Sequence, residues 1–123
     1  MNDESYMIIL KIEGYSFGEM IVDGRHYKKD LILYKENVRE TWCRERGHDV
    51  NIGDIDEYLH EFNPEILIFG TGKFGLMKVS SEVYEWCASN QVRLMVEKTG
   101  IAWRSYNKLA ASKNVLGAFH LTC

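Results

Sequence analysis

A short apolar run that ends on glycine places the strongest constraint on the fold. Residues 65–69 read Glu-Ile-Leu-Ile-Phe and continue directly into Gly70-Thr71-Gly72. A continuous apolar run of this length is typical of a strand that is covered on both faces of its sheet. Coverage of both faces requires other layers packed on that sheet, and helices are the usual cover for parallel strands. The run therefore predicts an α/β arrangement around residues 65–69.

The residues after the glycine turn alternate between helical and strand patterns. The expected elements are a helix from a cap at Ser80 or Ser81 to about Asn90, a strand over residues 92–96, a helix from Lys98-Thr99-Gly100 to about Ser112, and a strand over residues 115–121. Strand, helix, strand, helix and strand in this order predict a βαβαβ unit with right-handed crossovers and largely parallel strands.

The first 50 residues follow a different pattern, in which short β segments are separated by turns. Asp23-Gly24 is a tight-turn signal because glycine adopts positive φ without strain. The expected strands cover residues 6–12, 16–22, 27–34 and 38–42, followed by a charged loop and a short helix capped by Asp54 and ended before Pro64. We predict one α/β domain over residues 1–123, with an antiparallel β-meander in residues 1–50 and the α/β part in residues 51–123.

Charge and cysteine usage argue against several classes of function. The net charge of −3 gives no overall positive field for nucleic acid or an anionic membrane. Cys43, Cys87 and Cys123 are widely spaced and form no C-x-x-C pair, as expected of reduced thiols in a cytoplasmic protein. The apolar run near the N-terminus is too short and broken for a signal or membrane segment. The four histidines lack metal-ligand spacing, so we expect no metal.

The glycine turn first suggests a dinucleotide site. Residues 70–75 satisfy G-x-G-x-x-G after a strand, and Glu97 ends the next strand, where such folds keep a ribose-binding acid. However, a dinucleotide site needs the helix to begin inside the glycine motif, and residues 76–79 intervene before the serine caps. The G-K-[ST] ending of a P-loop is absent as well. We therefore expect neither site and no cofactor.

A smaller anion fits the pattern better. The carboxyl ends of parallel strands gather ligands in open α/β sheets, and two such ends carry Gly70-Thr71-Gly72 and Lys98-Thr99-Gly100. Both turns offer backbone N–H groups, hydroxyls and a lysine, and the second opens a helix whose positive end favours anions. The candidate ligand residues are Gly70, Thr71, Gly72, Lys73, Lys78, Lys98, Thr99 and Arg104. The alternative is that the glycines only permit tight turns and the lysines are solvated.

A second polar group lies in the loop after the meander and supplies an outer set of candidates. Trp42, Arg44, Arg46 and His48 combine an aromatic ring with cations, which suits a planar anion if the loop folds over the strand ends. The alternative is a charged loop that faces water. Asn107 joins this outer set because its amide can bond a neighbouring loop.

Several of these residues also resemble a known family. They are Ser16-Phe17-Gly18-Glu19-Met20 with Gly24, Tyr27 and Asp30, then Trp42, Gly70-Thr71-Gly72 with Lys78-Val79, Thr99, Tyr106-Asn107-x-Leu109, and the ending Phe119-His120-Leu121-Thr122-Cys123. The chain resembles the adipogenesis-associated Mth-domain family over nearly its whole length, with mitochondrial complex I assembly factor 3 as a distant relative. The resemblance implies a compact three-layer α/β fold with a mixed central sheet and roles as a protein partner, and it brings no established enzyme activity or cofactor.

Three functional hypotheses follow from the sequence. The first is a binding domain, without established catalysis, that holds a small anion or an acidic partner group at the cleft of Gly70–Gly72 and Lys98–Thr99. The second is an enzyme acting on a small anionic metabolite at the same cleft, although the sequence presents no catalytic set. The third is an interaction or assembly module with no small ligand, as a monomer or a homodimer.

Overall fold

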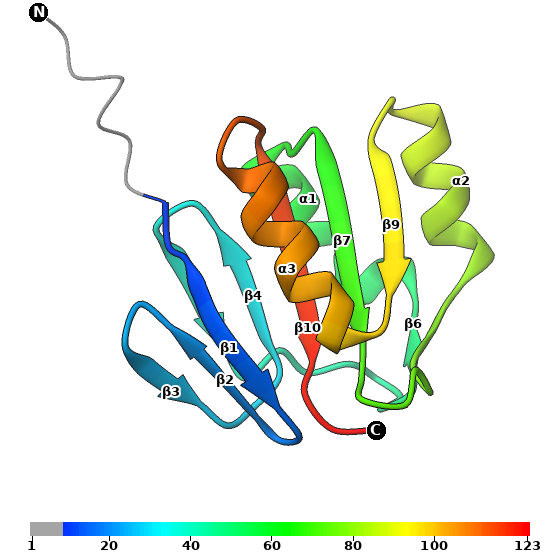
Figure 1. Ribbon diagram of the computed structural model, residues 1–123. Coiled ribbons are helices and arrows are strands. Elements are labelled where there is room, and N and C mark those ends of the chain that lie inside the picture. Colours follow the sequence, from blue (N-terminus) through cyan, green and yellow to red (C-terminus); the bar gives the residue numbers. More distant parts are fainter. Residues whose placement is uncertain (1–8) are drawn as a thin grey trace, which may run out of the picture.

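The apolar run forms an inner strand of a five-stranded mixed sheet (Figure 1). It is β7 (Ile66–Thr71), and all six of its residues are buried. The computed structural model describes residues 9–123, in which β7 lies between β10 (Val115–His120) and β9 (Arg93–Glu97) and pairs with both in parallel. β4 (Leu31–Tyr34) and β5 (Asn37–Glu40) extend the sheet beyond β10 in antiparallel fashion, which gives the order β5-β4-β10-β7-β9.

Helices connect the parallel strands and cover the two faces of this sheet. α2 (Ser81–Ser89) joins β7 to β9, and α3 (Thr99–Ala110) joins β9 to β10. A short 3-10 turn (Ile52–Asp54) and α1 (Asp56–Phe62) precede β7. Side chains of α3 enter one core, and side chains of α1 and α2 enter the other. Because β7 and β9 are parallel, their carboxyl ends lie at the same end of the molecule (Figure 1). The connections that follow the two strands therefore start side by side.

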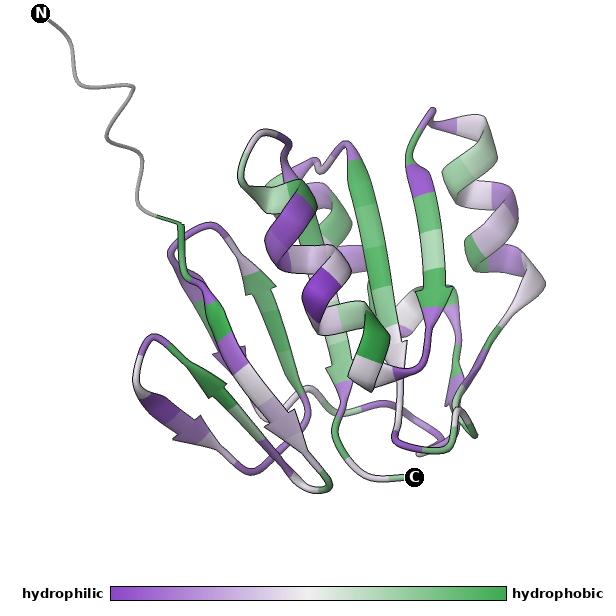
Figure 2. Cartoon of the chain, in the orientation of Figure 1, coloured by the Kyte–Doolittle hydropathy of each residue, from purple (hydrophilic) through white to green (hydrophobic). Residues whose placement is uncertain are grey.

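Alternation along β7 explains why the run is apolar throughout. Ile66 and Ile68 belong to the core beneath α3, whereas Leu67 and Phe69 belong to the core beneath α1 and α2. Successive side chains of a strand point to opposite faces, so two cores require apolar residues at every position. Figure 2 shows the resulting hydrophobic strands of the sheet, with hydrophilic residues concentrated in the loops, in β3 and on the outward side of α3.

A second, antiparallel sheet shares a core with α3. It contains β1 (Ile12–Ser16), β2 (Glu19–Val22) and β3 (Arg25–Tyr27) in that order. Its apolar side chains join those of α3 in one cluster. Asn107 of α3 fixes β1 in place, since Ile12 N donates to Asn107 Oδ1 at 3.0 Å and Asn107 Nδ2 donates to Ile12 O at 2.7 Å.

The expected fold class is confirmed, with a β-meander, a βαβαβ unit and a mixed central sheet in three layers. The single strand expected over residues 27–34 is wrong. The chain leaves the small sheet after Tyr27 and enters the central sheet at Leu31, so residues 28–30 form the link between two sheets. Residues 6–8 of the first expected strand lie outside the described residues, and β1 begins only at Ile12.

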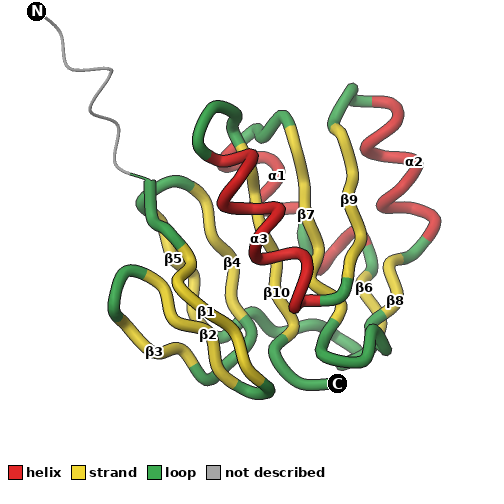
Figure 3. The backbone as a smooth tube through the Cα atoms, viewed as in Figure 1, coloured by secondary structure: helices red, strands yellow, loops and turns green. Residues whose placement is uncertain are grey.

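Three local features also differ from the sequence expectations. Residues expected as loops form a two-stranded parallel sheet of β6 (Asp49–Val50) and β8 (Lys78–Val79), which lie side by side in Figure 3. The apolar residues 92–96 predict a buried strand, but β9 is only partly buried, because it is the edge strand of the sheet among residues 9–123. Asp54 does not cap α1, since its carboxylate accepts hydrogen bonds from Glu45 N and Asn51 N. Within residues 9–123, no helix is both long and apolar enough to cross a membrane.

Candidate functional site

The glycine turn and the start of α3 lie in direct contact, and the Thr99 hydroxyl fills the space between them. Gly72 N donates to Thr99 Oγ1 at 2.8 Å, and Thr99 N donates to Gly72 O at 3.1 Å. The Thr99 hydroxyl in turn donates to His120 O at 2.6 Å, so it joins the ends of β7 and β10 to α3. A Cβ atom at Gly70 would lie only 2.8 Å from Thr99 Oγ1, which is why the approach needs glycine.

The remaining N–H groups of the turn also point at protein acceptors. Lys73 N donates to Thr122 O at 2.6 Å, and Leu76 N donates to Cys123 O at 3.0 Å. Gly72 has φ of +102°, and a Cβ there would lie 2.3 Å from the carbonyl carbon of Cys123. The chain's own residues 121–123 therefore occupy the backbone cradle that the sequence offered to an anion. A ligand bound near these turns has to contact their side chains instead.

Such side chains gather on the outer surface of the same two turns, in what we call the cationic pocket. This is a cavity of about 260 Å³ lined by Tyr15, Lys73, Lys98, Gly100, Ile101, Trp103 and Arg104. Three of these side chains are cationic and none is acidic. No ion pair within residues 9–123 involves Lys73, Lys98 or Arg104.

Local packing positions two of the three cations. The Arg104 guanidinium lies 4.8 Å from the centre of the Trp103 ring and makes one long hydrogen bond, 3.5 Å, to Gly100 O. The aliphatic part of Lys98 runs past Gly75, where an added Cβ would lie 3.3 Å from Lys98 Cγ. Gly75 is the third glycine of the apparent dinucleotide motif. Its φ of +73° belongs to a turn, and its missing side chain leaves room for the Lys98 side chain to pass.

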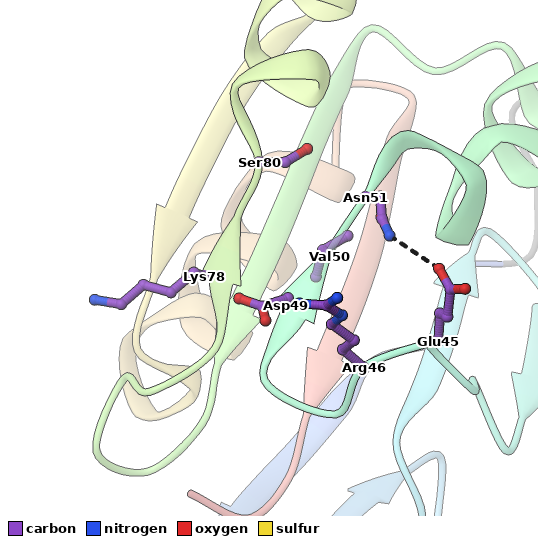
Figure 4. Close-up of a pocket in the computed structure, with 7 residues that line it drawn as sticks. All are labelled: Glu45, Arg46, Asp49, Val50, Asn51, Lys78 and Ser80. Atoms are coloured by element: carbon purple, nitrogen blue, oxygen red, sulfur yellow. Dashed lines mark hydrogen bonds between the residues drawn. The ribbon is translucent and has the colours of Figure 1, made fainter.

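Lys78 and Arg46 belong to a different cavity, of about 490 Å³, beside β6 and β8 (Figure 4). Two acidic residues, Glu45 and Asp49, line the same cavity and offset the two cations. Figure 4 shows the Lys78 side chain extending away from the other labelled residues. The structure therefore divides the predicted ligand set, because Lys78 does not join Lys73, Lys98 and Arg104.

Arg44, Trp42 and His48 form part of a third group, in which Trp42 and the Arg44 side chain are buried and His48 is exposed. Arg44 Nη2 donates to Asp30 Oδ2 at 2.8 Å, and its guanidinium lies 4.5 Å from the centre of the Trp42 ring. His120 Nδ1 contacts the same carboxylate oxygen at 2.7 Å, and the His48 ring packs edge-on against the His120 ring. We call Asp30, Arg44 and His120 the Asp30 cluster. The Arg44 side chain is only 4% exposed, so the loop does fold over the strand end, but Arg44 is engaged with Asp30.

The environment of Asp30 keeps it ionised. Burial alone would raise the pKa of Asp30, but hydrogen bonds from His120, Leu121 N and Arg44 outweigh that effect and lower the pKa below its usual value of 3.8. Leu121 N donates to Asp30 Oδ1 at 2.8 Å, so the carboxylate also fixes the chain where it leaves β10. The cluster therefore ties β4, the loop of residues 43–48 and residues 120–121 together.

Sequence reasoning gave no role to two residues that shape this region, Asp30 and Tyr15. Asp30 was visible only as part of a family resemblance, because its partners are 14 and 90 positions away. Tyr15 lines the cationic pocket, and its hydroxyl donates to Leu121 O at 2.8 Å. Within residues 9–123, no three His, Cys, Asp or Glu side chains are grouped to hold a metal ion.

Comparison with known proteins agrees with this architecture. Residues 12–120 match the model of a family described as a protein of unknown function, DUF498/DUF598. The chain belongs to this family. Structures similar to it include a Mth938-like domain from Bordetella pertussis, so the Mth-domain resemblance seen in the sequence is confirmed.

The DUF498/DUF598 fold is shared with proteins of low sequence identity. A conserved hypothetical protein from Pyrococcus horikoshii is 23% identical, with a TM-score of 0.83 over 92% of this chain and 99% of that one. A Xanthomonas campestris protein is 21% identical, with a TM-score of 0.78 over 98% and 91% of the two chains. The Bordetella pertussis domain is 16% identical, with a TM-score of 0.71 over 98% and 90%. These likenesses establish the fold and assign no ligand.

Replacing Thr99 by valine tests whether its hydroxyl closes the glycine turn. Thr99→Val leaves Gly72 N and His120 O without their partner inside the protein, and each buried unsatisfied group costs about 1–3 kcal/mol. We expect urea unfolding to show a loss of about 3 kcal/mol for this variant. Thr99→Ser keeps the hydroxyl and serves as the control, with a loss of about 1 kcal/mol for the methyl group. Equal stability of the two variants would contradict the assigned role.

Acid unfolding tests the Asp30 cluster. A carboxyl whose pKa is lowered by folding contributes stability above its unfolded pKa, and that contribution is lost as the pH falls through the folded value. We expect Asp30→Asn to be about 2 kcal/mol less stable than the wild type at pH 7. The difference shrinks below about pH 4, because the carboxyl of the unfolded wild type then binds a proton, and it is lost as the pH falls through the lowered pKa of the folded carboxyl. Urea unfolding between pH 3 and pH 7 measures this difference, with the exposed Asp56→Asn as control. A difference that stays constant over the whole range would contradict the assigned ionisation.

Proposed function

We propose that this domain is a binding module that holds a small anion, or an acidic group of a partner, in the cationic pocket. The observation that carries the proposal is that Lys73, Lys98 and Arg104 converge on one cavity with no acidic residue in its lining. The protein as a whole carries a net charge of −3. Three cations in one pocket therefore make a local positive field on a protein whose net charge is negative, and this field attracts an anion.

The backbone beneath the pocket adds to its positive potential. Gly100 and Ile101 lie in the first turn of α3, a helix of 12 residues, and both line the pocket. Thr99 N and Ile101 N already donate to Gly72 O and Lys98 O, so the start of the helix acts on an anion through its dipole, which favours negative charge. Lys73 is held from the other side by its backbone N–H bond to Thr122 O. The pocket therefore combines fixed backbone dipoles with cations from two separate turns.

The size of the cavity limits what it can hold. A volume of about 260 Å³ lies below the range of about 300–1,000 Å³ typical of pockets for drug-sized ligands and cofactors. It suits a phosphate, a sulfate or a single carboxylate side chain.

The titratable groups of the pocket favour binding over acid–base catalysis. Burial, and then the charges of Asp30 and Cys123, raise the pKa of Tyr15, so the phenol keeps its proton at neutral pH. Its hydroxyl already donates to Leu121 O. A catalytic alternative, in which the same pocket turns over a small anionic metabolite, predicts that bound ligand is chemically altered on prolonged incubation. A binding module returns it unchanged.

Calorimetric titration with phosphate, sulfate and acetate tests the proposal. We expect saturable binding of at least one anion that weakens as the salt concentration rises, because exposed charges are screened. Lys98→Ala and Arg104→Ala should each weaken that binding about threefold to tenfold, since each removes one cation within a few ångströms of the anion. Lys78→Ala removes a lysine from the other cavity and should leave the affinity unchanged. An equal loss in Lys78→Ala, or no saturable binding of any anion, would contradict the proposed site.

A further inference from the structure

Large apolar side chains stand exposed at the edge of the cationic pocket. Phe17 is 52% exposed, Phe74 is 61% exposed and Ile101 is 56% exposed. We call these three residues the apolar rim. Phe74 follows the pocket residue Lys73 in sequence, Ile101 itself lines the pocket, and Phe17 lies two positions after Tyr15. Exposed apolar groups gathered in one place, rather than scattered, mark interaction sites on soluble proteins.

The rim is brought together from three parts of the chain and is held by the backbone. Phe17 lies on the turn between β1 and β2, and the neighbouring Gly18 N donates to Leu121 O at 2.8 Å. The turn that carries Phe74 is held by the bonds of Lys73 N and Leu76 N to residues 122 and 123. The two phenyl rings have centroids 6.4 Å apart. Figure 1 places both turns, the start of α3 and the last residues at the same end of the molecule.

The exposed phenyl rings of Phe17 and Phe74 contribute little to the stability of the fold, because their apolar surface stays in contact with water. Both rings sit on tight turns anchored by backbone hydrogen bonds, so the backbone that carries them is held in place before any partner arrives. Fixed presentation reduces the ordering cost of binding. Aromatic side chains in such positions supply much of the binding energy at protein interfaces. A free anion in the pocket would leave this surface unused.

We propose that the cationic pocket and the apolar rim together dock an acidic peptide segment of a partner protein. The segment would place a carboxylate side chain in the pocket and an adjacent aromatic or aliphatic side chain against Phe17 and Phe74. Charge complementarity favours this occupant, because Lys73, Lys98 and Arg104 border the rim and no acidic residue lines the pocket. A second copy of this chain is a poorer match in charge, since both copies carry −3. This inference rests on the proposed function and names its partner.

Selection from a random dodecapeptide library displayed on phage tests the inference, because the library presents acidic and apolar residues in many different orders. The library is selected on the wild type after depletion on Lys98→Ala. We expect enriched peptides to share an acidic residue next to Phe, Trp or Leu. The most enriched peptide is then synthesised, and fluorescence anisotropy measures its affinity for the wild type and for variants. Peptides without shared acidic residues would overturn the inference.

The variants separate this inference from the proposed function. Phe74→Ser should weaken the selected peptide about tenfold and leave the phosphate affinity unchanged, whereas Lys98→Ala should weaken both. Tyr84→Ser removes an exposed aromatic ring of α2 and is the matched control, with no effect on either ligand. Thermal melting of each variant verifies that it is folded.

Each other outcome has a distinct meaning. If phosphate binds through Lys98 but no peptide depends on Phe74, the inference fails and the proposed function stands. If neither ligand binds, both fail. If Phe74→Ser instead abolishes a dimer in analytical ultracentrifugation, or abolishes binding to vesicles that contain phosphatidylserine, the rim serves a second copy or a membrane and the peptide assignment is overturned.

Discussion

The Thr99 hydroxyl makes the contact on which this end of the molecule depends. It accepts from Gly72 N and donates to His120 O, so one buried group joins the end of β7, the start of α3 and the end of β10. Because these bonds lie inside the protein, the polar groups of the glycine turn are satisfied without a ligand. The cations that we propose as the anion site, Lys73, Lys98 and Arg104, lie outside this closed turn. Backbone hydrogen bonds to residues 121–123 also hold the turns that carry Phe17 and Phe74.

The fold was predictable from sequence wherever local pattern decides structure. The apolar run of β7 indicated two covered faces, and the alternation after it indicated the βαβαβ unit. The pattern failed where pairing is non-local. Residues 27–34 begin and end with β-formers, and no glycine or proline marks a break between them. The chain nevertheless changes sheets at residues 28–30, because β3 pairs with β2 whereas β4 pairs with β10. The pairing of β6 with β8 joins two-residue segments 29 positions apart, and such short segments carry no periodic signal.

The site was predictable in part, for a topological reason. Lys73 and Lys98 follow neighbouring parallel strands, so both lie at the carboxyl end of the sheet. Arg104 reaches the same pocket from α3, the helix that begins just after Lys98. Lys78 was misplaced because the four residues that separate it from Lys73 lead the chain to β8 and a different cavity. The role of Arg44 could not be read from its neighbours, since it depends on an ion pair with Asp30, which sits where the chain changes sheets. Thr99 was noted as a ligand group, but only the packing of Gly70 and Gly72 shows that its hydroxyl faces inward.

The central claim is that anions bind outside the glycine turn, between the side chains of Lys73, Lys98 and Arg104. Amide chemical shifts of the ¹⁵N-labelled protein during a phosphate titration test it most directly, because they report each backbone position separately. The account predicts the largest shifts at the amides of Gly100 and Ile101, saturating with one Kd that rises about threefold to tenfold in Lys98→Ala. Largest shifts at Val50 and Ser80, in the cavity beside β6 and β8, or shifts that do not saturate, would contradict it.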